Sequence, residues 1–66
     1  MDLKKFVGHF VIIHDDLGKM HKGFISDYLY PEENDYDCES IILEKGNHSL
    51  IEFKLTDIVD IKQVCR

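Results

Sequence analysis

Histidines and carboxylates gather in one short stretch near the start of the chain, where their side chains have the chemistry of a metal site. His14, Asp15, Asp16 and His21 are close together in the sequence, and some registers of a hairpin would set His14 opposite His21. Zinc sites need several convergent ligands, and the chain has no His-x-x-x-His or Cys-x-x-Cys spacing. We therefore interpret these histidines as surface residues of a hairpin, and we predict neither a metal site nor a cofactor.

A second cluster, of acids and tyrosines, occupies residues 28–39 and has the chemistry of a contact surface. Its acids could chelate calcium, but an EF-hand loop needs a glycine at its sharp turn and a fixed ligand spacing, which this segment lacks. Tyrosine buries interface area with little loss of rotamer entropy, and acids attract a basic partner. The residues that we expect to contact a protein partner are Tyr28, Tyr30, Glu32, Glu33, Asp35, Tyr36 and Asp37. The alternative is that these acids only solubilise the protein and shield a strand edge.

The sequence contains no recognisable catalytic motif. Ser26, Ser40 and Ser49 lie in no nucleophile-elbow context, and there is no Gly-rich phosphate loop. The strand pattern described below predicts a small β-barrel, and such a barrel fills its interior with its own side chains, which leaves no room for an enclosed active site. We therefore predict that the protein is not an enzyme.

Size and charge restrict both the domain organisation and the class of partner. The chain has 66 residues, enough for a single domain spanning residues 1–66. Its net charge of −5 repels phosphate backbones, so nucleic-acid binding is not expected. The opposing interpretation is a local basic patch formed by Lys4, Lys5, Lys19 and Lys22.

The cysteines and the N-terminal residues favour a cytoplasmic location. Cys38 and Cys65 are far apart in the sequence, whereas disulfide-stapled secreted domains of this size usually carry more cysteines. No segment has the length of a signal peptide's apolar region or of a membrane span. We predict reduced thiols and no contact with a membrane.

Five short segments rich in apolar residues predict five β-strands, over residues 10–13, 19–29, 41–43, 50–54 and 59–62. Gly18 supplies the first hairpin turn, and Gly23 inside the long second segment predicts a bend or bulge. Residues 2–7 predict one short N-terminal helical turn with Asp2 as its N-cap. The predicted core residues are Phe10, Ile12, Phe24, Ile41, Leu43, Ile51, Phe53, Val59 and Ile61.

Two stretches of the chain resemble a known family. Residues 11–13, the turn at residues 16–19 and the run Gly23-Phe-Ile-Ser-Asp27 are similar to the first motif of Sm-like proteins, and a Leu-Thr-Asp-Ile turn precedes the last strand. The chain therefore resembles the SH3-like small β-barrels of the Sm-like type, including short uncharacterised bacterial proteins. The resemblance implies an all-β, five-stranded antiparallel barrel.

The chain departs from this family at the residues that would bind RNA. Asp27 is followed by Tyr28, Asn34 is displaced into the acidic segment, and the position before the last strand reads Thr56-Asp-Ile-Val with no Arg-Gly pair. The RNA-binding residues of the family are therefore not carried over. The expected function is a small acidic protein-binding module of the cytoplasm whose acidic loop contacts a basic partner. The remaining alternatives are Sm-like RNA binding and a structural subunit that forms a homodimer through an edge strand.

Overall fold

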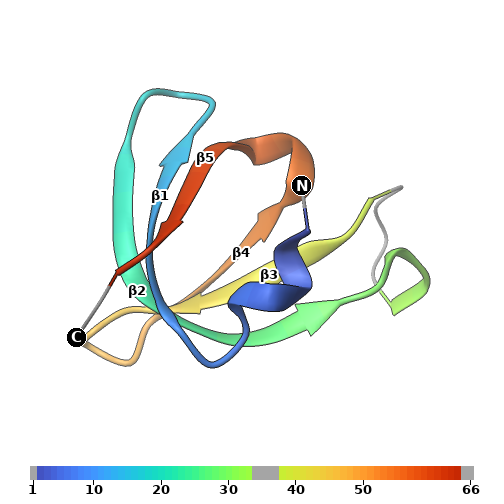
Figure 1. Ribbon diagram of the computed structural model, residues 1–66, viewed down its shortest axis with the longest axis horizontal. Helices are drawn as coiled ribbons and strands as arrows, with labels where there is room; N and C mark the ends of the chain where they lie inside the picture. Colours follow the sequence, from blue (N-terminus) through green and yellow to red (C-terminus); the bar gives the residue numbers. More distant parts are fainter. Residues whose placement is uncertain (1, 34–37, 65–66) are drawn as a thin grey trace.

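The computed structural model describes residues 2–33 and 38–64, which form one curled antiparallel sheet with three short 3₁₀ turns (Figure 1). The elements in chain order are η1 (Leu3–Phe6), β1 (Phe10–Asp15), β2 (Met20–Leu29), η2 (Pro31–Glu33), β3 (Ser40–Glu44), β4 (Leu50–Lys54), η3 (Leu55–Asp57) and β5 (Ile58–Gln63). The strand order is β4-β3-β2-β1-β5. The predicted all-β fold, with five antiparallel strands and a short N-terminal turn, is confirmed. Among the described residues the sheet does not close, because β4 pairs with β3 alone and β5 with β1 alone.

The hairpin between β1 and β2 is held by the carboxylate of Asp15 at the end of β1. Its Oδ1 accepts hydrogen bonds from the backbone N–H groups of Leu17, at 3.0 Å, and Lys19, at 2.8 Å. Gly18 has a φ of 83°, a conformation that residues with a β-carbon rarely adopt. The predicted turn at Gly18 is therefore confirmed, and it has a physical requirement for glycine.

Strand β2 is long because it pairs with β1 near its start and with β3 towards its end. Gly23 lies just before this change of partner, where a β-carbon would be only 2.5 Å from the backbone oxygen of Glu44. The register of the β2–β3 pair then shifts between Ile25 and Asp27. The irregularity predicted at Gly23 is thus a close approach of two backbones, and the bulge follows it at Ser26.

The core lies on one face of the sheet, which we call the inner face. The buried apolar residues are Leu3, Phe6, Val11, Ile13, Ile25, Ile41, Leu43, Phe53, Ile58 and Ile61, and the half-buried Tyr28, Ile51 and Leu55 pack against them. Ile41, Leu43, Phe53 and Ile61 are confirmed as core residues. In β4 the alternation identified the inner face correctly, because Leu50 and Glu52 are exposed while Phe53 is buried.

The core prediction is wrong for Phe10, Ile12 and Phe24, which point to the opposite, outer face. Val11 and Ile13 are buried in their place, and Phe10 is 38% exposed. Residues 10–13 are apolar on both faces of the strand, so alternation could not identify which set is inward. The pairing of Phe10 with Phe24 then places both aromatic rings on the outer face.

The core prediction is also wrong for Val59, which is 67% exposed. Asp15 pairs with Ile58 and His14 pairs with Asp60, so Val59 is an extra residue in β5 without a partner in β1. This bulge allows both Ile58 and Ile61 to face the core, although their spacing is not that of a regular strand.

The N-terminal turn η1 contacts β2 and β3 on the inner face (Figure 1). Leu3 is fully buried and Phe6 is nearly so, which makes η1 part of the core. The predicted cap is wrong in one respect, since the Asp2 side chain makes no capping hydrogen bond. Among the residues described, there is no helix whose length and apolar character would suffice to cross a membrane.

Candidate functional site

Tyr28 and Tyr30 meet at the end of β2, beside the start of the acidic segment. They are separated by one residue, so both side chains project to the same side of the extended chain. Their ring centroids are 5.0 Å apart with planes at 87°, an edge-to-face arrangement. Tyr28 is half-buried against the core, whereas Tyr30 is 43% exposed. Pro31 follows at once and begins η2, because proline has no N–H with which to extend the strand.

The ammonium group of Lys4, from η1, lies over both tyrosine rings. Its Nζ is 4.7 Å from the ring centroid of Tyr30 and 5.7 Å from that of Tyr28. Both distances are within the range of cation–π attraction. A hydrogen bond with Tyr30, together with the electrostatic influence of that group, raises the pKa of Lys4 above its ordinary value. The tyrosine pair therefore already accommodates an ammonium group.

The carboxylate of Glu39, at the C-terminal end of the acidic segment, completes this cluster. Partial burial raises the pKa of Tyr28, and the negative charge of Glu39 and a hydrogen bond with it add to the effect. Glu39 is half-buried, and Glu32 is exposed in η2. We call the group of Tyr28, Tyr30, Glu32 and Glu39 the tyrosine site. The two rings and the carboxylate of Glu39 form an environment that favours a cation.

The structure describes part of the predicted contact surface. Tyr28 and Tyr30 lie together, and Glu32 follows them in η2. The backbone of Glu33 closes η2. The remaining predicted residues, Asp35, Tyr36 and Asp37, lie outside the described residues. Sequence reasoning assigned Lys4 to a basic patch and missed its contact with the tyrosines, because nothing local links residues so far apart in the chain.

A second polar cluster surrounds Asp15 and His21 at the opposite end of β2. Nε2 of His21 is 2.8 Å from Oδ2 of Asp15, and their side chains are only 15% and 10% exposed. The His21 ring packs on Phe53 with centroids 4.9 Å apart, and Nζ of Lys45 is 3.5 Å from Nδ1. These partners suit the tautomer with its proton on Nε2. The hydrogen bond from His21, with those from the backbone of Lys19 and Leu17, holds the pKa of Asp15 below its ordinary value.

The suggested pairing of His14 with His21 is wrong. Ile13 is the partner of His21, and His14 is the partner of Met20. His14 therefore projects from the outer face, where its Nδ1 is 3.8 Å from Oδ2 of Asp60. The interpretation as surface residues holds for His14 and fails for His21, which is nearly buried. In residues 2–33 and 38–64, no three His, Cys, Asp or Glu side chains are grouped so that they could hold a metal ion.

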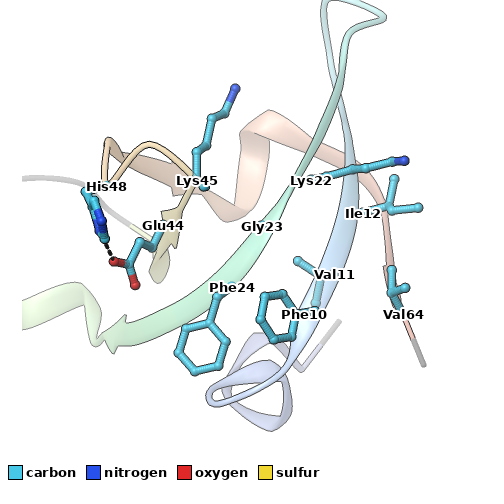
Figure 2. A pocket seen from close by; sticks show the side chains of 11 residues that line it. Phe10, Val11, Ile12, Lys22, Gly23, Phe24, Glu44, Lys45, His48 and Val64 are labelled. Atoms are coloured by element: carbon cyan, nitrogen blue, oxygen red, sulfur yellow. Dashed lines mark ion pairs between the residues drawn. The ribbon is translucent and has the colours of Figure 1, made fainter. Parts of the chain in front are cut away.

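A groove on the outer face is the feature that sequence reasoning missed. Its volume is about 720 Å³, and Figure 2 shows the Phe10 and Phe24 rings side by side at its floor. The ring centroids of this pair are 5.2 Å apart with planes at 63°. Ile12 and Val64 extend the floor towards β5. We call this feature, floored by Phe10, Ile12, Phe24 and Val64, the outer-face groove. The signal in the sequence was the run of apolar residues at 10–13, which is too apolar for a strand with one wet face.

Comparison of the chain with protein-family models, with curated proteins and with solved structures found no match.

Proposed function

We propose that the protein is a small protein-binding module that holds a lysine or arginine side chain of a partner at the tyrosine site. The observation that carries the proposal is the position of Lys4, whose ammonium group rests over the rings of Tyr28 and Tyr30. A partner's cation would meet the same rings, where the charge of Glu39 already acts on Tyr28, and Glu32 follows two residues after Tyr30 in the chain. We also propose that Glu33, Asp35, Tyr36 and Asp37, which the sequence assigns to the contact surface, take part in binding this partner.

We also propose that the fold is an SH3-like barrel of the Sm-like type, as in short uncharacterised bacterial proteins, and that the protein works in the cytoplasm. The strand order β4-β3-β2-β1-β5 and the 3₁₀ turn η3 between β4 and β5 support this assignment. Small barrels of this kind place their binding residues on the connections between strands. The tyrosine site lies at such a connection, between β2 and β3.

A selection experiment tests the proposed function. A library of random peptides displayed on phage is selected on the immobilised full chain, and the binding of enriched peptides that contain Lys or Arg is measured by fluorescence anisotropy. We expect Tyr30→Ser and Glu32→Lys each to weaken this binding, because one removes an aromatic ring and the other repels a cation. Both side chains are exposed, so the thermal unfolding curve should change little.

Asp16→Lys is the matched control for Glu32→Lys, because Asp16 is an exposed acid in the β1–β2 turn and the net charge changes equally. The control variant should bind the basic peptides almost as wild type does. If no basic peptide is enriched, or if Tyr30→Ser binds such peptides as tightly as wild type, the tyrosine site is not the contact surface.

A role as an oligomeric structural subunit is a second candidate, because the sheet is open. Strands β4 and β5 are at its two ends, and an unpaired strand edge is a template for a second chain. Leu50 on β4 is 65% exposed, which would add apolar contact to such pairing. Nucleic-acid binding has weaker support, since Lys4 is engaged with the tyrosine rings and the net charge is −5.

A further inference from the structure

The outer-face groove is an apolar surface that no element of the described chain covers. The core needs only the inner face, yet Phe10, Ile12, Phe24 and Val64 give the outer face an apolar floor of its own. Phe10 and Phe24 bury part of each other's rings, but Phe10 remains 38% exposed. The volume of about 720 Å³ is in the range of clefts that bury a ligand's side chains.

The charges around this floor are mainly positive, although the protein as a whole is acidic. Lys22 in β2 and Lys62 in β5 are both partners of Ile12, so they flank it on the outer face, and both are exposed. Lys45 also borders the groove at the β3–β4 turn, but its side chain projects away from the Phe10 and Phe24 rings (Figure 2). Its Nζ lies 3.5 Å from Nδ1 of His21, so the positive charge of the groove comes from Lys22 and Lys62. The acid at this border, Glu44, has His48 as its partner, with 3.6 Å between Oε2 and Nδ1. The groove therefore combines an apolar floor with an excess of lysine.

We propose that the outer-face groove binds an acidic peptide segment of a partner protein that carries bulky apolar side chains. The apolar side chains would contact Phe10, Ile12 and Phe24, and carboxylates would meet Lys22 and Lys62. The tyrosine site lies on the other side of the sheet, because Tyr28 is the partner of the inward-facing Ile41. The groove would therefore act independently of the basic partner proposed above, and one small domain could join two segments of opposite charge.

Two other occupants fit the groove less well. Single-stranded nucleic acid stacks its bases on flat aromatic faces, but the Phe10 and Phe24 planes are inclined at 63° and the rest of the floor is aliphatic. A second copy docked face to face would bring together two floors that are both flanked by Lys22 and Lys62, and these like charges repel. An acidic, apolar peptide meets neither obstacle.

The test begins with peptides selected from a random library on the full chain, from which those rich in Asp, Glu and large apolar residues are synthesised. Their dissociation constants are measured for wild type, for Lys22→Glu/Lys62→Glu, and for the control Lys5→Glu/Lys19→Glu. The control residues are exposed and lie outside the groove, and the net charge of the two double variants is the same. We expect the groove variant to lose about tenfold or more in affinity and the control to lose much less.

Two further measurements locate the site without relying on charge. The acidic peptide should shift the backbone amide resonances of Phe10, Ile12 and Phe24 in the labelled protein and leave those of Tyr28 and Tyr30 unchanged. Phe10→Ala, checked by its thermal unfolding curve, should also weaken binding. The proposal fails if the selection yields no acidic apolar peptide, or if such peptides bind both double variants equally. It fails as well if an oligothymidine or a second copy of the chain, detected by sedimentation, shifts the same resonances instead.

Discussion

Lys4 occupies the position over the tyrosine rings that a partner's cation would need. Its ammonium group belongs to the same chain, so it competes with every external cation for the rings of Tyr28 and Tyr30. At the residue scale this contact therefore sets a threshold for binding. A partner can bind only if it offers more contact than a single lysine, because it must displace the ammonium group of Lys4 from the rings.

Replacing Lys4 by Gln should strengthen the binding of basic peptides to the tyrosine site. Removal of the internal ammonium frees the rings, and an exposed cation–π contact has an energy equivalent to about two- to fivefold in affinity. Fluorescence anisotropy with the selected basic peptides measures the change. Lys5→Gln is the control, because Lys5 lies over Phe6 and its removal changes the net charge equally. Equal gains in the two variants would show that only net charge matters.

Asp15 gives the protein a stability that depends on pH. Because folding lowers the pKa of this carboxyl, its ionised form favours the folded state. The contribution is complete above the ordinary pKa of 3.8 and is lost as the pH falls through the lower folded value. Asp15→Asn should therefore lose less stability than wild type between about pH 6 and about pH 3, measured by urea unfolding. Asp16→Asn, in the same turn, should keep the wild-type loss, and equal losses in all three proteins would contradict the assignment.

At the element scale, the crossing of β2 from β1 to β3 depends on Gly23. A β-carbon at this position would be 2.5 Å from the backbone oxygen of Glu44 and 3.0 Å from the Leu43 side chain. Gly23→Ala should reduce the free energy of unfolding by about 1–3 kcal/mol, because a backbone oxygen cannot move aside easily. Gly46→Ala is the control, since a β-carbon there meets nothing within 4 Å. Urea unfolding of both variants measures the difference, and equal stabilities would show that the two strands separate at little cost.

The elements differ in how far their sequence determined them. Strand β4 has polar residues on one face, so Phe53 was predicted to face inward and does. Strand β1 is apolar on both faces, so its orientation depends on the tertiary structure, and Phe10 was assigned to the wrong face. In β5, the bulge at Val59 has no local sequence signal.

The candidate site also combines a contact that the sequence predicts with one that depends on the tertiary structure. The meeting of Tyr28 with Tyr30 follows from their spacing along a strand, whereas the approach of Lys4 depends on how η1 packs against the sheet. The outer-face groove was missed because it follows from the orientation of β1, which the sequence left open.

At the scale of the whole molecule, the open sheet predicts self-association. Sedimentation velocity at about 100 µM, a concentration that detects weak dimers, should show a dimer. We expect this dimer to form through an edge strand. Leu50→Lys should weaken this dimer, because Leu50 is exposed on β4. Leu17→Lys is the control, since Leu17 is also exposed but lies in the β1–β2 turn. A single monomeric species at that concentration would rule out pairing through the edge.

The pairing of β5 with β1 also determines the order in which the chain can fold. The β1–β2 hairpin joins neighbouring residues, whereas the pairing of Val11 with Gln63 joins residues near opposite ends of the chain. Closing so large a loop costs more entropy, so we expect the hairpin to form early and β5 to dock last. Ile58 and Ile61 belong to β5 and complete the core. During synthesis on the ribosome, the inner face would therefore stay exposed to water until β5 has emerged.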